Sequence, residues 1–354
     1  MTQTFSIRRP LSSSDDPKAA PRTKIANPKW VGLVTLGCAF ALWGAEAQAQ
    51  QPAKVPRIGY LGGTSPAAYA GRIEAFRQGL RELGYVEGKN LVIERRYAEG
   101  KPDRLGELAA ELVRLKVDII ISAGPAVTRF LKAATSTIPI VMTNEGDPVG
   151  SGFVVSLSRP GGNITGLSSL APELSGKRLE LLKETVPKLS RVAVLGNSTE
   201  PANAQSLREV DLAAGAMGVK VQYLDILSPK DLETSFRAAS KGRADAILNL
   251  VAGAIATANR PQIIELAVKS RLPAIYNSAE FVDAGGLMSY AASLTDLSAR
   301  AAVYVDKILK GRTPADLPVE QPTKFEFIVN LKAAKQIGLT IPPNVLVRAD
   351  KVIK

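Results

Sequence analysis

Histidine is missing from this 354-residue sequence, and cysteine occurs once, at Cys38. A nucleophilic serine or cysteine needs a neighbouring base, most often histidine, so serine–histidine and cysteine–histidine catalytic pairs are excluded. Zinc sites also draw on cysteine and histidine, so a metal site is not expected. Neither a P-loop nor a complete glycine-rich dinucleotide motif is present, so no nucleotide cofactor is indicated. We therefore expect no cofactor and no enzyme activity, with an exported hydrolase as the alternative.

Aromatic residues make up only 5% of the sequence, and no run of basic residues is interleaved with them. The net charge is nevertheless +12, from 45 lysines and arginines against 33 acidic residues. Proteins that bind nucleic acids gather their basic residues in a patch or stripe. Here the basic residues are scattered singly along predicted helices, as at Lys307 and Lys310. We therefore expect a solvated basic surface and no nucleic-acid partner.

Long hydrophobic runs are scarce, and the uncharged apolar run Trp30–Gly44 is shorter than the roughly 20 residues of a membrane-spanning helix. Basic residues precede it and an Ala-x-Ala sequence follows it, which is the order of a secretory signal peptide. Residues 1–49 are therefore predicted to be a signal peptide with a long n-region, cleaved after Ala49, which makes the protein periplasmic. Three alternatives stay open: an uncleaved membrane anchor, a lipoprotein modified at Cys38, and a twin-arginine signal at Arg8-Arg9.

Beyond this leader, apolar runs of strand length alternate with helical stripes. The run Val117–Ile121 is almost continuously apolar, as expected for a strand buried on both faces of a parallel sheet. From Leu294 to Ile308 apolar residues recur at intervals of three and four, the spacing of one helix face. The alternation predicts an α/β fold with parallel sheets covered by helices on both faces. The predicted strands are 57–61, 91–94, 117–121, 138–142, 191–195, 219–224, 244–250, 274–276, 287–290 and 325–329.

The chain is too long for one ordinary domain and fits two. After the strand 138–142 the alternation stops in a segment rich in serine, glycine and proline, and it then begins again. We therefore predict two Rossmann-like lobes of similar pattern. A polar loop at the carboxyl end of a buried strand is where an open α/β protein binds its ligand. The stretch Thr143–Asp147 is predicted to be one wall of a ligand cleft.

Other small and polar residues also follow the predicted strands at the points where those strands end. In two facing lobes these residues would line one cleft. Hydroxyls, amides and the N–H groups of helix N-termini suit a carboxylate, and Asp147 or Glu280 could meet an ammonium group. The predicted ligand is therefore a small, amino-acid-like zwitterion or carboxylate, although Ser65, Ser122 or Asn277 could instead be helix caps only. The candidate ligand-binding residues are Gly63, Thr64, Ser65, Ser122, Gly124, Thr143, Asn144, Asp147, Asn197, Asn277, Glu280 and Tyr290.

Four parts of the chain carry the pattern of a known family. They are Ala75–Leu80 with Leu83–Tyr85, Gly146–Gly152 with Arg159–Gly166, Phe281–Tyr290, and Leu317–Phe325. Together they resemble the ABC-transporter substrate-binding family of the type I periplasmic-binding-protein fold, whose characterised members include tryptophan- and tyrosine-binding proteins. The resemblance covers about 55–353.

The resemblance implies a venus-flytrap protein, whose two lobes are joined by a three-crossover hinge and close over a ligand. The first lobe would comprise 55–166 and about 277–300, and the second 167–276 and about 301–354. The closed form would dock as a monomer on an ABC permease in the inner membrane, driven by a cytoplasmic ATPase. The alternative on this fold is a sensory binding protein that signals to a membrane receptor.

The resemblance also implies where the ligand binds. The ligand loops would be those after the first, third and fourth strands of the first lobe, together with Asn197 and the loop Asn277–Phe281. One segment departs from the family pattern, which leads us to expect a bulky, often aromatic loop after the strand 244–250. The chain has Val251–Ala254 there. This removes a stacking surface and argues against an aromatic amino acid as the ligand.

Overall fold

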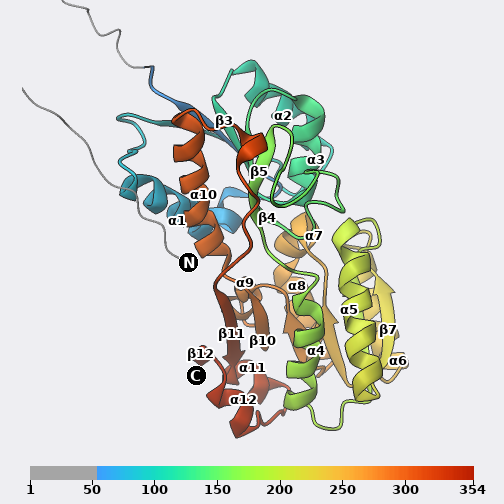
Figure 1. Cartoon of the computed structure of the whole chain (residues 1–354). Coiled ribbons are helices and arrows are strands. Elements are labelled where there is room, and N and C mark those ends of the chain that lie inside the picture. The colour runs from blue at the N-terminus through green and yellow to red at the C-terminus, as the bar shows by residue number, and fades with distance from the viewer. Residues whose placement is uncertain (1–53) are drawn as a thin grey trace, which may run out of the picture. The chain divides into compact units, whose positions relative to one another are not determined.

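The computed structural model describes residues 54–354. In this part of the chain, helices surround two sheets that are dominated by parallel strands (Figure 1). The predicted α/β class with two parallel-dominated sheets is therefore confirmed. The predicted signal peptide 1–49, its cleavage after Ala49 and the alternatives at Cys38 and Arg8-Arg9 lie outside the described residues.

The first sheet has five parallel strands in the order β2-β1-β3-β4-β5. Alternate side chains of a strand point to opposite faces, so Ile119 and Ile120 of β3 belong to two different cores. One core is closed by α1 and α10, which pack side by side (Figure 1), and the other by α2 and α3. The elements of this first lobe are β1 (Arg57–Gly62), a 3₁₀ helix (Pro66–Tyr69), α1 (Ala70–Glu82), β2 (Val92–Tyr97), α2 (Arg104–Arg114), β3 (Ile119–Ser122), α3 (Pro125–Ala134), β4 (Ile140–Glu145), β5 (Ile164–Ser168), α10 (Leu294–Leu309) and a 3₁₀ helix (Pro314–Asp316).

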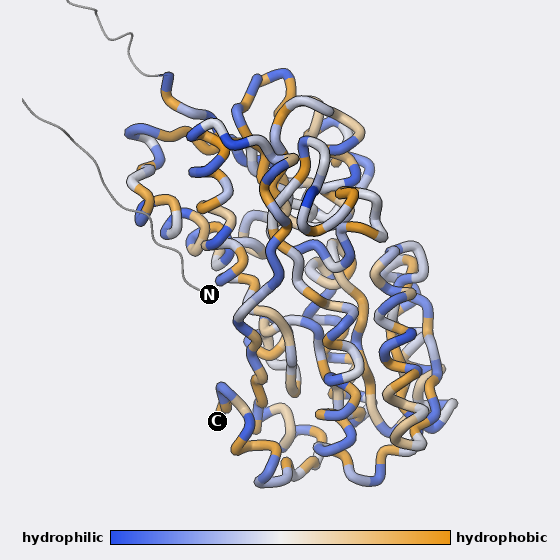
Figure 2. The backbone as a smooth tube through the Cα atoms, in the orientation of Figure 1, coloured by the Kyte–Doolittle hydropathy of each residue, from blue (hydrophilic) through white to orange (hydrophobic). Residues whose placement is uncertain are grey.

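The second sheet has seven strands in the order β12-β11-β10-β9-β8-β6-β7. Its two cores lie against α4, α5, α11 and α12 on one face and against α6, α8 and α9 on the other. Figure 2 shows hydrophobic and hydrophilic residues alternating along the surrounding helices. The elements of this second lobe are α4 (Leu174–Thr185), β6 (Arg191–Gly196), α5 (Pro201–Met217), β7 (Lys220–Asp225), α6 (Asp231–Lys241), β8 (Ala246–Asn249), α7 (Gly253–Ala258), α8 (Arg260–Lys269), β9 (Ala274–Tyr276), α9 (Ala279–Asp283), β10 (Met288–Ala292), β11 (Phe325–Asn330), α11 (Leu331–Gln336), α12 (Pro343–Val347) and β12 (Lys351–Ile353).

Two differences from the predicted strands bear on the site. The strand β4 runs to Glu145, beyond the predicted end at Met142, so the polar stretch begins inside the sheet. The following segment, predicted as a connection, contains β5, which pairs with β4. Gly166 allows this pairing: its φ is +132°, and a Cβ there would lie 2.2 Å from the Met142 carbonyl oxygen. A short strand with glycine inside it and Pro-Gly-Gly before it has little apolar periodicity, which is why the pattern did not predict it.

Strand pairing divides the chain differently from the predicted lobes around 277–300. The strand β10 pairs in parallel with β9 and antiparallel with β11, so it belongs to the second sheet rather than to the first lobe. The chain leaves the second sheet only at Ser293, and α10 then packs on α1. The strand β11 runs antiparallel to β10, and every other strand pair of the second sheet is parallel.

Three connections join the two lobes. The first runs from β5 to α4, the second from β10 to α10, and the third from α10 through Leu317–Glu320 to β11. The backbone N–H of Ser168 donates to Glu320 O at 2.9 Å, and that of Ser293 donates to Lys324 O at 3.2 Å. The third connection therefore lies beside each of the other two. Three adjacent crossings form a narrow joint about which two lobes can hinge.

Candidate functional site

The carboxyl ends of the first-lobe strands contact helices of the second lobe. A Cβ placed on Gly63, just after β1, would lie 3.7 Å from the Cβ of Ala254 in α7. A Cβ on Gly146, just after β4, would lie 3.0 Å from the Cβ of Ala202 in α5. Glycine and alanine at these contacts let the two lobes approach closely. The polar residues expected at the strand ends thus lie at the junction between the lobes.

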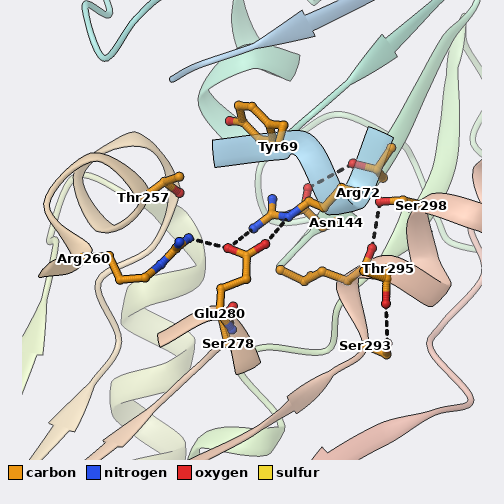
Figure 3. A network of polar contacts seen from close by, with 12 residues as sticks. Tyr69, Arg72, Asn144, Thr257, Arg260, Ser278, Glu280, Ser293, Thr295 and Ser298 are labelled. Carbon is orange, nitrogen blue, oxygen red and sulfur yellow. Dashed lines mark hydrogen bonds and ion pairs between the residues drawn. The ribbon is translucent and has the colours of Figure 1, made fainter. Parts of the chain in front are cut away.

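An ion-pair network crosses this junction (Figure 3). The Arg72 guanidinium, from α1, donates through Nε and Nη2 to the Glu280 carboxylate of α9 at 2.6 and 2.8 Å. The Arg260 guanidinium of α8 also donates to this carboxylate. The Arg72 guanidinium lies over the Tyr69 ring, 5.4 Å from its centroid, and the residue is only 8% exposed. A bidentate, largely buried pair of this kind is the strong form of a salt bridge.

The network carries a net positive charge, because two guanidinium groups share one carboxylate. Burial lowers the pKa of Arg72, but the adjacent Glu280 raises it, and the net shift is upward. Burial lowers the pKa of Arg260. Its Nε is buried and has no acceptor among the described residues. The junction therefore holds a cationic N–H group with unused hydrogen-bonding capacity.

Three oxygen atoms at strand ends are buried and also lack a partner within residues 54–354. They are Thr64 Oγ1 after β1, Glu145 Oε2 at the end of β4, and Asn249 Oδ1 at the end of β8. Thr64 is 2% exposed, Glu145 1% and Asn249 0%. Most buried polar atoms in proteins have partners, and an unsatisfied one costs about 1–3 kcal/mol. These oxygens therefore mark places where a bound molecule would supply the missing donor.

Glu145 is the most unusual of the three. Burial raises the pKa of its carboxyl from the ordinary 4.5 to about 8, while hydrogen bonds from the backbone of Asp147 and Gly146 act in the opposite direction. The charges of Glu200 and Asp147 raise it further. A carboxyl with this pKa holds its proton at neutral pH and can be ionised by a cation that comes close.

The structure uses several first-lobe candidates for internal hydrogen bonds. The Gly63 N–H donates to the Tyr69 hydroxyl at 3.1 Å. The Ser122 hydroxyl shares a hydrogen bond with Thr128 at 2.7 Å, and the Thr143 hydroxyl donates to Ser122 O at 3.0 Å. These bonds tie the strand ends to the 3₁₀ helix at Tyr69, to α3 and to each other. They leave the backbone N–H of Gly63 unavailable to an anion in this arrangement.

Other first-lobe candidates shape the loops. The Gly124 φ is +140°, a value that favours glycine, and this residue precedes α3. The Asn144 Oδ1 accepts from the Thr143 hydroxyl at 3.1 Å. The Asp147 Oδ1 accepts from the Gly150 N–H at 2.7 Å, so its carboxylate closes a turn. Ser65 precedes the 3₁₀ helix but makes no side-chain capping bond.

Most of the second-lobe candidates also interact with other residues of the protein. The Asn197 Oδ1 accepts from the backbone and hydroxyl of Thr199. The Asn277 Nδ2 donates to Leu250 O at 3.3 Å and to Val251 O at 3.1 Å. Glu280 forms the ion pairs above. The Tyr290 ring packs with Phe325 and Phe327 in the core of the second sheet.

The structure adds residues that the candidate set does not contain. Arg72 and Arg260 lie on α1 and α8, and charge alone does not show which arginine is buried. Asn249 could be noticed as an amide at the end of an apolar strand, and Glu145 lies inside the predicted polar stretch. Among residues 54–354, no cluster of three or more metal-ligating side chains is present. Within the same range, no helix is long and apolar enough to cross a membrane.

Comparison with known proteins gives consistent matches. The sequence model of the family described as ABC transporter substrate binding protein matches residues 65–353. A tyrosine-binding protein of Clostridioides difficile (strain R20291) is 25% identical over 266 residues, which are 75% of this chain and 76% of that protein. Among solved structures, an ABC domain in complex with L-Trp from Streptococcus pneumoniae has a TM-score of 0.78 at 26% identity, over 84% of this chain and 99% of that one. A conserved domain protein from Vibrio cholerae has a TM-score of 0.78 at 30% identity, over 84% and 100% of the two chains.

Proposed function

The chain belongs to the family of ABC transporter substrate-binding proteins, and from this premise we propose that it is the exported solute-binding component of an ABC importer that captures an amino-acid-like ligand between its two lobes. The family is one of substrate-binding transport proteins rather than of enzymes. A relative named for tyrosine and a similar structure that holds L-Trp support an amino acid as the ligand class.

The observation that carries this proposal is the set of unsatisfied buried groups at the junction of the lobes. Thr64, Glu145 and Asn249 offer oxygen atoms without donors, and Arg260 offers an N–H group without an acceptor. The α-ammonium group of an amino acid has N–H donors, and its carboxylate has acceptors. A zwitterion therefore complements both kinds of group, whereas an inorganic anion would complement only the arginine.

Two features favour a ligand with a small side chain. Ala254 lies against Gly63, where the family pattern leads us to expect a bulkier loop. The nearby aromatic rings of Tyr69 and Tyr97 are packed against each other and against Gly62, whose Cβ would come within 2.8 Å of Tyr69. These rings form a filled wall rather than a free stacking surface. We therefore favour an aliphatic or small polar amino acid over tyrosine or tryptophan.

The first test is to identify the ligand. Mass spectrometry of small molecules released from gently purified, then denatured, protein should detect an amino acid. In a thermal-shift screen of the twenty common L-amino acids, one at 100 times its Kd should stabilise the fold by about 2.7 kcal/mol. That corresponds to a rise in Tm of several degrees. If no amino acid is released and none raises Tm, the proposed ligand class is wrong.

A pair of variants then tests the site. Asn249→Ala removes the buried Oδ1 and should weaken binding about tenfold or more, because a hydrogen bond is lost. Asn344→Ala removes an exposed amide on α12 and should leave the affinity unchanged. Equal affinities for the two variants would remove Asn249 from the site. The import role is tested separately by loss of uptake of the identified amino acid when the gene is deleted.

A further inference from the structure

The neighbours of Glu145 do not explain why a carboxyl is buried at this position. Its Oε1 accepts a hydrogen bond from the Gly146 N–H at 3.1 Å, and the backbone of Asp147 also hydrogen-bonds the carboxyl. Its buried Oε2 has no partner in the described part of the chain. The charges that act on it most strongly, Glu200 and Asp147, are both negative. A buried carboxyl without a cation is costly, and an apolar side chain of similar size would avoid that cost. A positively charged donor would complement this carboxyl.

The surroundings of Glu145 place its carboxyl between the lobes. The next residue, Gly146, lies against Ala202 at the start of α5, which belongs to the second lobe. The backbone oxygen of Glu145 accepts from the Ser169 N–H at 2.8 Å, in the first connection between the lobes. A group bound at Glu145 would thus contact the edge of the first sheet beside the hinge.

The acidic surroundings define the chemistry of the partner. Asp147 follows Glu145 in the loop, and Glu200 precedes α5 from the opposite lobe. Arg129 of α3 lies 3.8 Å from the Glu200 carboxylate, but Glu200 and Asp147 both raise the pKa of Glu145. These surroundings therefore favour a cation over a carboxylate.

We infer that Glu145 binds the α-ammonium group of the ligand as a carboxylate, and that it releases its proton to solvent when the ligand binds. This inference rests on the proposed function and adds the residue that recognises the ammonium group. In the free protein below about pH 8 the carboxyl is protonated, because burial raises its pKa to about 8. The ammonium group arrives with its own charge, the carboxyl proton leaves to the buffer, and an N–H···O ion pair forms. The total charge of protein, ligand and released proton is conserved.

This chemistry makes binding dependent on pH. Below the pKa of free Glu145, ionising the carboxyl opposes binding, so the apparent Kd should fall by up to about tenfold for each rise of one pH unit. Above about pH 8 it should level off.

Titration calorimetry tests the inference directly. An amino acid identified by the thermal screen is titrated into the protein at pH 6.5 in phosphate and in imidazole, whose ionisation enthalpies differ. The difference in observed enthalpy should correspond to release of about one proton per ligand. The same acid without its amino group should bind with no such release.

A conservative variant separates recognition from folding. Glu145→Gln keeps an oxygen for the Gly146 N–H but cannot carry a charge, so it should bind the amino acid about 10- to 100-fold more weakly and release no proton. Glu107→Gln, an exposed change on α2, should behave as the unaltered protein. If the unaltered protein binds the amino acid without releasing a proton, the inference is overturned, even where Glu145→Gln fails to fold. If no amino acid binds at all, the proposed function fails first, and this inference fails with it.

Discussion

At the scale of single residues, the junction holds charged side chains that are largely buried yet belong to different lobes. Arg72 and Glu280 are 208 residues apart in the chain and form a bidentate pair. Glu145 is buried without any such partner. The Arg72–Glu280 pair adds stability because both charges are satisfied. The buried Glu145 carboxyl lowers stability when no ligand is bound.

Glu145 should make the free protein less stable as the pH rises. Its pKa is raised in the folded state to about 8 from an ordinary 4.5, so between these values the folded state binds more protons than the unfolded state. The free energy of unfolding then falls with rising pH, by up to about 1.4 kcal/mol per unit. Urea unfolding of the unaltered protein and of Glu145→Gln should be compared at pH 5, 6, 7 and 8. As the pH rises, the free energy of unfolding of the unaltered protein should fall relative to that of the variant. Parallel pH curves for the two proteins would contradict a raised pKa.

Glu280 should contribute more to stability than an exposed carboxylate does. Glu280→Gln leaves the buried Arg72 without its charged partner and should lower the free energy of unfolding by about 2 kcal/mol. Glu74→Gln is the matched control, since Glu74 pairs with Arg77 and Arg81 on the exposed face of α1. Exposed pairs contribute little, so this control should unfold at the same urea concentration as the unaltered protein. Equal effects of both changes would show that the pair across the junction is weak in solution.

At the scale of elements, α1 and α10 illustrate how a distant segment completes a lobe. These helices, Ala70–Glu82 and Leu294–Leu309, lie far apart in the sequence, and Gly79 lets them pack closely. A Cβ at Gly79 would lie 2.5 Å from Ala299 O and 3.0 Å from the Ala302 Cβ. The glycine is therefore required by the neighbouring helix backbone rather than by its own conformation.

Gly79→Ala should therefore destabilise the protein by about 1–3 kcal/mol, because the added methyl group forces the two helices apart. Gly71→Ala lies on the same helix, where a Cβ would meet nothing within 4 Å. That change should be neutral or stabilise by up to about 1 kcal/mol, since alanine favours a helix more than glycine does. Urea unfolding distinguishes the two. A similar gain in both variants would mean that α10 does not pack on α1 as described.

At the scale of the whole molecule, the contacts between lobes determine whether a ligand can enter. The lobes meet at Gly63 with Ala254 and at Gly146 with Ala202, and three adjacent connections join them. Ligand exchange must separate these contacts while the connections stay intact. Movement about the connections is therefore a requirement of the proposed function.

A disulfide across the junction should stop this movement. The positions of Gly63 and Ala254 place Cβ atoms 3.7 Å apart, within the range of about 3.5–4.5 Å that disulfides adopt. Cysteines at both positions, in a protein without residues 1–49 and so without Cys38, should form a disulfide on oxidation. A bound amino acid should then dissociate much more slowly, and dithiothreitol should restore its exchange. Each single cysteine variant should exchange ligand normally, and free thiols persisting in the oxidised double variant would argue against this contact.

The sequence alone determined the α/β class, most strand positions and the family. These properties depend on local patterns: apolar runs of strand length, helical spacing, and motifs such as Gly146–Gly152. The alternation of elements also located the polar strand ends, because in a parallel sheet the carboxyl ends must share one edge. Thr64 and Glu280 are found at the junction for this reason.

Only the tertiary structure decided which of these residues are paired and which are left unsatisfied. Gly63, Ser122 and Asp147 form hydrogen bonds with Tyr69, Thr128 and Gly150 respectively. No local pattern predicts those partners. The partner of Arg72 lies 208 residues away, and β5 exists because β4 supplies its hydrogen bonds. Burial without a partner, which distinguishes Glu145 from the other acidic residues, arises only when distant segments fold together and exclude water.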